Sequence, residues 1–370
     1  MTEKKLWISV CIPVYNTEPF LLQCLRSVFM QEFDDFEILI VSDASRGKDE
    51  QGRSAKKIIR VAQKECAAYR KQKGLSKMKI RFIENRENHG ILEVRRTLCY
   101  EALGEYICFV DSDDVLESGA LRSLLQIPGS SPRMTDSPVS LTEAPVSLSG
   151  LTRQSYDIIQ GKSTSGTFDQ AGNFVPSKVN RYNSITIGEL KEHQIFHEWV
   201  TNGKITGVVW GKLIKRSLLV KAFENIPYSE CNMAEDYLIS FFVNQFAKVY
   251  VGIDSKVYRY RITSGVSSSR KIDTLRKWEM ICSTANVFTV IVQWINENES
   301  TSKITPEELL HIKRQTSVYL ANNLKQMKET VVPELQVQAR QLLCDYWGEH
   351  FVGTVEERLS GTLREPQGPQ

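Results

Sequence analysis

The sequence predicts an α/β protein with a doubly wound, mostly parallel sheet and a C-terminal helical appendage. Short apolar runs alternate with helical patterns over the first 125 residues, which is typical of βαβ units. Helical periodicity dominates from about residue 271. The chain has 370 residues, of which 41% are hydrophobic and 25% charged, close to the average of soluble globular proteins. This composition excludes a disordered chain, a fibrous repeat and a membrane channel.

Four strands are expected in the first part of the chain, at residues 8–14, 37–41, 79–83 and 106–110. The first, second and fourth are almost continuously apolar, as strands covered on both faces are. Thr17 and Pro19 predict the start of a helix after the first strand, and residues 54–70 predict a second helix. Right-handed crossovers between the strands then give a doubly wound sheet.

The remainder of the chain is expected to form four further segments. Residues 128–154 predict a mobile loop, because prolines and serines replace apolar periodicity there. A second folded region follows at 155–270, and a helical region at 271–353. In the helical region, Thr305, Pro306 and Glu308 predict a capping box. The polar tail, 354–370, should fray. One continuous helical stripe is expected at Trp278, Ile281, Ala285, Phe288, Val292 and Ile295.

Charge, cysteine spacing and hydropathy exclude several classes of protein. The net charge of +3 is too small to favour a nucleic acid as partner. The eight cysteines never form a C-x-x-C pair, so we interpret them as reduced, packed thiols of a cytoplasmic protein. His193 and His197 lack the H-E-x-x-H pattern of zinc proteases, and we interpret their spacing as chance. No apolar run approaches the ~18 residues of a spanning helix, and residues 1–14 do not form a secretory signal.

Polar residues follow three of the predicted strands. They are Tyr15 and Asn16 after the first strand, residues 42–45 after the second, and residues 111–114 after the fourth. Ligands of such sheets bind at the carboxyl ends of the strands, so these residues are candidates for a binding site. Neither a G-x-G-x-x-G after the first strand nor a G-x-x-x-x-G-K-[ST] is present in the sequence. We therefore expect a metal ion held by carboxylates to neutralise any phosphate bound here.

Asp111, Asp113 and Asp114 lie together just past the fourth strand. Three carboxylates at one strand end repel one another unless a cation lies among them, which favours a metal site. The alternative is that Asp113 or Asp114 caps a helix that begins near Glu117. These residues alone do not decide between the two interpretations.

Four motifs in the first 125 residues occur in a recognisable order. They are VCIPVYN at 10–16, FEILIVSDAS at 36–45, NHG at 88–90 with Arg95, and GEYICFVDSDD at 104–114. Looser motifs follow at 210–213, 234–236 and 257–261. Together they resemble the family-2 glycosyltransferases of the GT-A fold. The resemblance implies that residues 1–127 form the nucleotide-sugar-binding half of a GT-A domain and residues 155–270 its acceptor-binding half, and it leaves the loop and the last hundred residues uncovered.

The resemblance implies a donor site at the strand exits. Asp43 corresponds to an aspartate that accepts a hydrogen bond from the nucleotide base, and uracil or thymine offers a ring N–H where cytosine offers none, which favours a UDP-linked sugar. Asp111 is expected near the ribose, and Asp113 on Mn²⁺ or Mg²⁺ bridging the two phosphates. Arg95 would add positive charge there, or form an ordinary salt bridge. The expected donor-binding residues are Pro13, Tyr15, Asn16, Asp43, Arg95 and Asp111.

The acid pair Glu235 and Asp236 opens a predicted helix. The resemblance assigns Asp236 to deprotonating the acceptor hydroxyl, whereas the alternative is a charge that complements the helix dipole. Trp210, Lys212 and Glu235 are expected around the acceptor. A tryptophan can offer a flat face to a sugar ring but is more often core, and Lys212 can contact phosphate or face water.

The sequence departs from the family pattern at two places. Residues 42–44 read Ser, Asp, Ala where the family usually has two aspartates and a glycine. Residues 94–96 read Val, Arg, Arg where alanine, arginine and asparagine are usual. The base-reading carboxylate is retained, but the nucleotide preference is less well defined.

Residues 53–81 carry eleven Lys and Arg against one acid, Glu65. Such a surface is usually only solvated, but it can also dock on anionic lipid at about 1 kcal/mol per basic residue. A peripheral contact at the inner face of the membrane would suit a lipid-linked acceptor.

The expected function is inverting, metal-dependent transfer of a hexose from a nucleotide diphosphate sugar to a hydroxyl of a glycan or glycolipid, as in cell-envelope polysaccharide biosynthesis. One alternative, a sugar nucleotidyltransferase, would show a glycine-rich loop bearing Lys or Arg after the first strand, which residues 13–17 are not. The other alternative is a glycan-binding or scaffold relative. That protein would have lost the acids, and Asp43, Asp111, Asp113 and Asp236 are all present.

Overall fold

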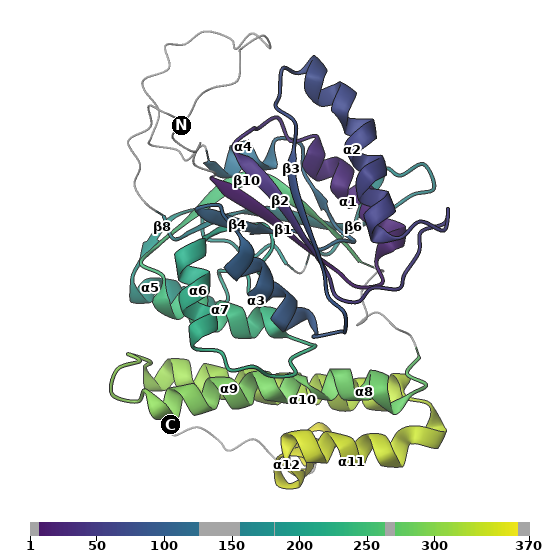
Figure 1. The fold of residues 1–370 in the computed structure, drawn as a ribbon. Helices are drawn as coiled ribbons and strands as arrows, with labels where there is room; N and C mark the ends of the chain where they lie inside the picture. The colour runs from purple at the N-terminus through teal and green to yellow at the C-terminus, as the bar shows by residue number, and fades with distance from the viewer. Residues whose placement is uncertain (1–6, 126–155, 181, 263–270, 362–370) are drawn as a thin grey trace.

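The structure is a computed structural model of the chain, and it describes residues 7–125, 156–180, 182–262 and 271–361. Within these residues one sheet has ten strands in the order β3-β2-β1-β4-β9-β6-β10-β5, with β7 paired to β6 and β8 to β10 (Figure 1). The strands are β1 (Ile8–Val14), β2 (Phe36–Ser42), β3 (Lys79–Glu84), β4 (Tyr106–Phe109), β5 (Val115–Leu116), β6 (Ile158–Phe168), β7 (Phe174–Pro176), β8 (Gly188–Lys191), β9 (Lys212–Lys215) and β10 (Val249–Arg261).

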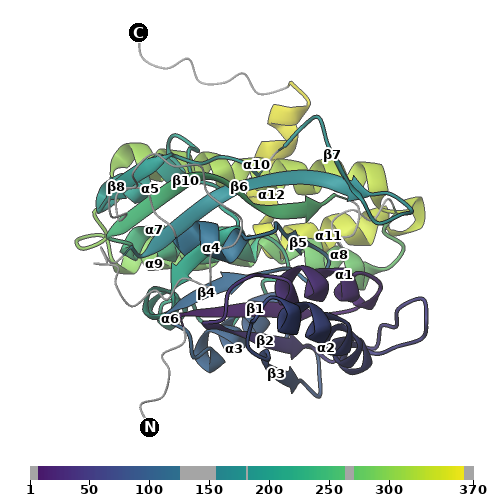
Figure 2. The same cartoon turned by 90° about the horizontal axis from the view of Figure 1, so that it is seen from above.

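The four strands expected from the sequence are β1 to β4, and all four are parallel to their neighbours within this set. The three longest pairings of the described sheet, β1 with β2, β2 with β3 and β6 with β10, are all parallel. β9 lies antiparallel between β4 and β6 and so joins the two halves of the sheet. Figure 2 shows β6 and β10 side by side from above. The predicted mostly parallel sheet is confirmed.

Helices cover both faces of the sheet, as a doubly wound fold requires. Because successive side chains of a strand point to opposite faces, Cys11 of β1 lies in one core, while Val10 and Ile12 lie in the other. The first core is covered by α3 (Ile91–Glu101), α5 (His193–Val200), α6 (Arg216–Glu224) and α7 (Glu235–Phe246). The second is covered by α1 (Glu18–Phe29), α2 (Ala55–Gln72) and α4 (Ala120–Leu125).

The C-terminal part is helical and packs beneath the α7 face of the sheet (Figure 1). It comprises α8 (Leu275–Cys282), α9 (Thr284–Glu297), α10 (Pro306–Thr330), a short 3-10 helix (Pro333–Leu335), α11 (Gln336–Trp347) and α12 (Glu349–Leu359). Phe288 of α9 and Ile312 of α10 belong to the first core, so these helices share a core with the sheet. The predicted capping box is confirmed, because the Thr305 side chain accepts from the Glu308 amide and the Glu308 side chain accepts from the Thr305 amide.

Three expectations about the helices are corrected. The stripe from Trp278 to Ile295 is not continuous, because Ser283 separates α8 from α9 and Val292 is 43% exposed. The tail does not fray at residue 354, because burial of Val352 and Val355 carries α12 to Leu359. The helix expected near residue 117 begins only at 120, after β5. The loop at 128–154 and the end of the tail, 362–370, lie outside the described residues.

All eight cysteines are buried and unpaired, which confirms that they are packed thiols. In the part of the chain that the structure describes, no helix combines the length and the apolar character that crossing a bilayer requires.

Candidate active site

The loops after β1 and β2 are joined by hydrogen bonds. The Asn16 amide donates to the Ser45 hydroxyl over 2.7 Å, and the Arg46 amide donates to Asn16 Oδ1 over 3.3 Å. Ser45 in turn donates to Oε1 of Glu18, at the start of α1, over 2.6 Å. Tyr15 is 43% exposed beside these loops. Pro13 is buried within β1, opposite Val41 of β2.

Backbone strain collects at the expected site. Among the described residues, non-glycine residues with positive φ are Asn16 (56°), Ala44 (53°), Ala234 (61°), Glu192 and Lys303. The first two directly follow β1 and β2, and Ala234 directly precedes the acid pair of α7. Such conformations cost about 1–3 kcal/mol each and persist where the surrounding structure enforces them, often at functional sites.

Asp43 organises the loop that precedes α3. Its carboxylate accepts hydrogen bonds from Nδ2 of Asn85 (2.8 Å), the His89 amide (3.0 Å) and the Gly90 amide (2.9 Å), and the residue is 2% exposed. The sequence did not indicate this structural role. A carboxylate has about four acceptor positions, so three donors leave room for one more. Base recognition by Asp43 stays a prediction.

The three acids after β4 have different surroundings. Asp111 Oδ1 accepts from Nη2 of Arg95 over 3.1 Å. Asp114 is 1% exposed, and its carboxylate accepts from the Tyr258 hydroxyl (2.8 Å) and the Arg261 amide (2.7 Å). Burial, with the charges of Asp113 and Asp111, raises the pKa of Asp114 well above its usual value. Asp114 therefore anchors β10 to the strand exit, and neither Asp113 nor Asp114 caps α4, which begins at residue 120.

Arg95 links the strand exit to α7. It is 2% exposed, and its Nη2 lies 3.1 Å from Asp111 Oδ1, 3.4 Å from Glu235 Oε1 and 3.4 Å from Asp236 Oδ1. Burial alone would lower the pKa of Arg95, but the three carboxylates outweigh burial and raise it. Its Nη1 is buried and has no hydrogen-bond partner among the described residues. Arg95 therefore forms the salt bridge that the sequence offered as one interpretation, and its role in donor binding stays a prediction.

Glu235 and Asp236 form the first turn of α7. Burial raises the pKa of Asp236 to about 8, with Arg95 opposing the rise and Glu235 adding to it. Burial also raises the pKa of Glu235, again against the effect of Arg95. Asp236 Oδ1 is buried and accepts no hydrogen bond from the described residues. A carboxylate that titrates near neutral pH and has an unused oxygen fits a general base.

The side chains of Lys212 and Trp210 are both buried. Lys212 is 3% exposed, its Nζ donates to the Thr206 carbonyl over 2.6 Å, and burial lowers its pKa to about 7 despite the charge of Asp236. It does not face water, and its contact with a phosphate stays a prediction. Trp210 is 3% exposed and stacks on Tyr258 and Tyr260, with ring centroids 4.5 and 5.4 Å apart. Its ring is therefore mostly core, although Trp210 is also part of the cavity lining, and contact with a sugar stays a prediction.

A cavity of about 860 Å³ contains Arg95, Asp111, Glu235 and Asp236 in its lining. Six of the predicted residues are not part of this lining: Pro13 and Lys212, which lie within strands, and Tyr15, Asn16, Asp43 and Asp113, which follow strands. The opposite wall comes from α10, whose lining side chains are His311, Gln315, Tyr319, Asn322, Asn323 and Gln326. The sequence motifs gave no indication of this wall. The one available signal was the spacing of its polar residues, which places them on one helix face.

His193 and His197 are not a chance pair. Nε2 of His193 and Nδ1 of His197 each lie 3.1 Å from a carboxylate oxygen of Glu308, which is fully buried. The i, i+4 spacing on α5 therefore serves to hold the start of α10, and the earlier interpretation is corrected.

Comparisons with known proteins agree with the motifs. Residues 9–127 match the family described as Glycosyl transferase family 2. EpsH of Bacillus subtilis is 28% identical over 257 residues, and the match covers 69% of this chain and 60% of that protein. The glycosyltransferase GlyA of Streptococcus pneumoniae is 26% identical over 70% of this chain, but the match covers 31% of GlyA. The chain thus spans less than two thirds of each of these relatives.

Among solved structures, Staphylococcus aureus TarS 1–349 in complex with UDP-GlcNAc covers 97% of this chain and 93% of its own, with a TM-score of 0.48 and 17% identity. A likeness at this level carries no functional inference. The motifs at the strand exits and the sequence match over the same region agree. Residues 9–127 of this chain are therefore similar to glycosyl transferase family 2.

Proposed function

We propose that the chain transfers a hexose from a nucleotide diphosphate sugar, preferably UDP-linked, to a hydroxyl of a glycan or glycolipid, with inversion at the anomeric carbon. The observation that carries the proposal is the carboxylate of Asp236, which has one buried oxygen and a pKa raised to about 8, in a cavity that it shares with Arg95 and Asp111. In this proposal the first part of the chain, to residue 125, holds the donor. Residues 156–262 bind the acceptor.

The proposed reaction is a single displacement. Asp236 accepts the proton of the acceptor hydroxyl as that oxygen bonds to the anomeric carbon, and the bond from this carbon to the diphosphate oxygen breaks. The nucleotide diphosphate leaves with the electron pair. The Arg95 guanidinium, with its unpaired Nη1, stabilises the negative charge that develops on the leaving group. Inversion follows because the hydroxyl attacks opposite the leaving group.

Asp113 fits the role of a ligand for Mn²⁺ or Mg²⁺. Among the described residues, no three side chains of the metal-binding types lie close enough to hold a metal ion alone. A nucleotide-bound cation needs only one or two protein carboxylates, because phosphate oxygens supply the other ligands. Asp113 is part-exposed at the exit of β4, whereas Asp114 is 1% exposed. When bound, the cation would act as a Lewis acid toward the departing diphosphate.

Asp113→Asn should abolish Mn²⁺-dependent binding of UDP-glucose while leaving the fold nearly unchanged, because removing one of several clustered carboxylates relieves repulsion. Calorimetric titration of UDP-glucose with and without Mn²⁺ measures this. The matched control is Asp254→Asn, an acid that is 69% exposed on β10. Undiminished Mn²⁺-dependent affinity in Asp113→Asn would remove Asp113 from the metal site.

The function as a whole is tested by an assay of UDP release with the wild-type chain. It should release UDP from UDP-glucose in the presence of Mn²⁺ when neutral hexosides are supplied as acceptors. Binding without UDP release would favour a binding-only relative, and incorporation of UTP with release of pyrophosphate would indicate a nucleotidyltransferase.

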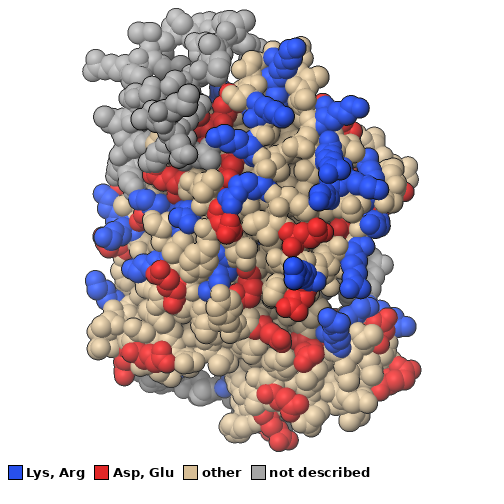
Figure 3. Space-filling view, viewed as in Figure 1, with Lys and Arg blue, Asp and Glu red and all other residues tan. Residues whose placement is uncertain are grey.

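We also propose that the basic residues around α2 contact an anionic lipid surface. Of the eleven basic residues in this segment, Arg53, Arg70, Lys73 and Arg81 pair with acids. These acids lie outside residues 53–81, so the count of basic and acidic residues within this segment overstates its unpaired positive charge. Exposed side chains that have no carboxylate within 4 Å in the described parts of the chain include Lys56, Lys57, Arg60, Lys64, Lys71 and Lys77. Figure 3 shows blue side chains gathered over α2.

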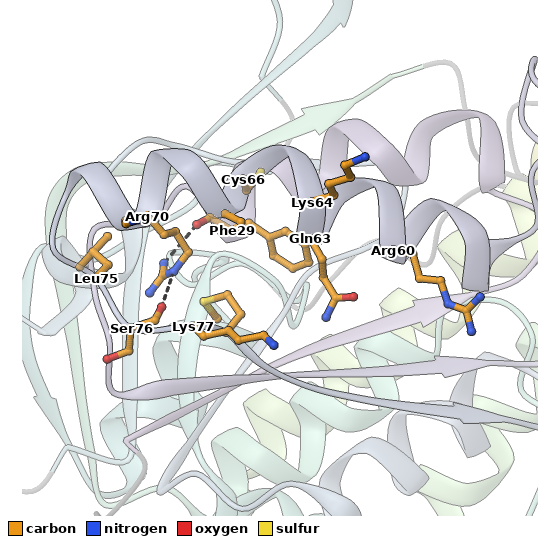
Figure 4. Close-up of a pocket in the computed structure, with 12 residues that line it drawn as sticks. Phe29, Arg60, Gln63, Lys64, Cys66, Arg70, Leu75, Ser76 and Lys77 are labelled. Carbon is orange, nitrogen blue, oxygen red and sulfur yellow. Dashed lines mark hydrogen bonds between the residues drawn. The ribbon is translucent and has the colours of Figure 1, made fainter.

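A groove of about 540 Å³ adjoins this basic surface (Figure 4). Phe29, Leu75 and Met78 give it an apolar lining, while Arg60 and Lys64 lie along α2. Arg70 closes the groove by donating to the carbonyls of Phe29 and Ser76. An apolar lining bordered by unpaired cations suits the interface of an anionic membrane.

Replacing Lys56, Arg60 and Lys64 by Gln should weaken binding to vesicles that contain phosphatidylglycerol by about 10²-fold. The reason is that each basic residue near such a surface contributes about 1 kcal/mol. Co-sedimentation with vesicles of phosphatidylcholine, with and without phosphatidylglycerol, measures this. The matched control replaces Lys313, Lys325 and Lys328, which are exposed on α10, by Gln. Equal binding by both triple variants would exclude the α2 surface.

A further inference from the structure

The polar face of α10 lies across the cavity from the proposed general base. His311, Gln315, Tyr319, Asn322 and Gln326 are spaced by three or four residues, so they share one face of the helix. All five line the cavity that also contains Asp236. The helix lies outside residues 9–127, the region that matches the family. This wall is therefore a feature of this chain beyond the matched domain.

α10 is held firmly in this position. Its first turn is fixed by Glu308, which contacts both histidines of α5, and Ile312 is buried in the core beneath the sheet. The Tyr319 ring lies 5.8 Å from that of Tyr237 and 5.2 Å from that of Phe288. Tyr237 directly follows Asp236 in the chain. The polar wall and the proposed base therefore belong to one packed unit.

The amide side chains of this wall are unengaged. Gln315, Asn322 and Gln326 form no side-chain hydrogen bond to any other residue that the structure describes. The Tyr237 hydroxyl, in the same lining, is buried and lacks a hydrogen-bond partner among the described residues. Buried polar atoms in proteins are normally hydrogen-bonded, so an unpaired hydroxyl that lines a cavity points to a ligand. Amides offer both donors and acceptors, as a polyhydroxylated ligand requires.

The charges of the cavity limit the chemistry of that ligand. Arg95 is the one Lys or Arg in the described lining of the cavity, and its guanidinium already lies near three carboxylates. Phosphate and carboxylate groups are usually bound by Arg or Lys, which this wall lacks. The aromatic side chains of Tyr182, Trp199 and Tyr319 are also part of the lining. Rings and amides together suit the apolar faces and hydroxyls of an uncharged sugar.

We propose that α10 forms the acceptor-binding wall and that the acceptor presents an uncharged sugar residue there, not a phosphate-bearing unit. This inference rests on the proposed transferase function. Gln315, Asn322 and Gln326 hold the sugar by hydrogen bonds, so that one of its hydroxyls reaches Asp236. Acceptor specificity then depends on the C-terminal helices as well as on the sheet domain.

The test uses the full chain with UDP and Mn²⁺, and two sets of probes: neutral p-nitrophenyl hexosides and the same hexosides carrying a 6-phosphate. Affinity is measured by saturation-transfer NMR titration. At least one neutral hexoside should bind, and its 6-phosphate should bind at least tenfold more weakly. Gln315→Ala and Asn322→Ala should each weaken hexoside binding about fivefold to tenfold and leave the affinity for UDP unchanged. The control is Lys325→Ala, on the same helix and 70% exposed, which should change neither affinity.

The inference is overturned if no neutral hexoside binds, if the phosphorylated hexosides bind as well, or if the two amide variants bind like wild type. Failure of the proposed function has a different signature. In that case wild type would fail to bind UDP or to release it from UDP-glucose, while hexoside binding that depends on α10 would persist.

Discussion

Asp236→Asn should lower the kcat of sugar transfer by about 10²- to 10⁴-fold while the dissociation constant of the donor stays within a few-fold of wild type. A general base acts only as the acceptor hydroxyl loses its proton, so its removal affects the rate far more than binding. Asparagine keeps the size of the side chain but cannot take the proton. UDP release gives the rate, and calorimetry gives the donor affinity.

The pH dependence of kcat/KM in the wild-type protein should also report the ionisation of Asp236. Because the pKa of Asp236 is raised to about 8, kcat/KM should rise with pH through about 8 as the carboxylate ionises. Asp236→Asn should lose this dependence. Glu235→Gln should keep the dependence but move it to lower pH, because the charge of Glu235 adds to the rise of the pKa of Asp236.

Stability separates the catalytic role from a purely structural one. A carboxyl whose pKa is higher in the folded state binds its proton more tightly when folded, so its contribution to stability is present below the unfolded pKa of about 4 and is lost as pH rises to about 8. Asp236→Asn removes this loss, and the variant should be more stable than wild type above pH 8. A charge that only complements the dipole of α7 would instead cost up to ~1 kcal/mol on removal and leave the rate unchanged. Wild-type turnover with a lowered melting temperature would transfer the catalytic assignment to Glu235.

The local pattern of the sequence was sufficient to predict β1, β2 and β4, because strands buried on both faces are apolar throughout and their exits are marked by polar residues. It also predicted β3, which is partly exposed. The resemblance to family-2 glycosyltransferases, and not the local pattern, predicted a site that includes Asp111, Arg95 and Asp236, although 140 residues separate Arg95 from Glu235. What the sequence could not predict depends on long-range packing. The acids that neutralise Arg70 and Lys73 precede α2 in the chain, and Lys212 is buried only because the sheet closes over it.

The α10 wall is the clearest example of a feature that depends on long-range packing and could not be predicted from the sequence. A stripe of His, Gln, Tyr and Asn on one helix face has the composition of a solvated surface, and the sequence offers nothing to distinguish that surface from the wall of a cavity. Long-range contacts, among them those of Glu308 with the two histidines of α5 and of Tyr319 with Tyr237, place this face in the cavity that contains Asp236. Asp114 is a similar case. The sequence shows it only as a third acid beside the predicted metal ligand Asp113, and does not indicate that it accepts hydrogen bonds from Tyr258 and Arg261.

Arg95→Met should destabilise the protein by about 3–5 kcal/mol at neutral pH, because the change leaves Asp111, Glu235 and Asp236 without their shared cation. Methionine fills a similar volume, so the loss reports charge and not a cavity. Urea denaturation at several pH values measures the free energy of unfolding. Arg95→Met/Glu235→Gln should recover part of the loss, since one of the carboxylates that remain is then neutral.

The pH dependence of this loss distinguishes electrostatics from packing. Without Arg95 the pKa values of Glu235 and Asp236 should rise further, because the group that opposes their increase is absent. Acids with raised folded-state pKa values destabilise the fold increasingly as pH rises. The difference in stability between wild type and Arg95→Met should therefore be small near pH 5 and grow toward pH 8 and above. If the difference is the same at every pH, Arg95 contributes only packing, including its contact with the Phe109 ring at 5.2 Å, and the three carboxylates must be stabilised by other groups.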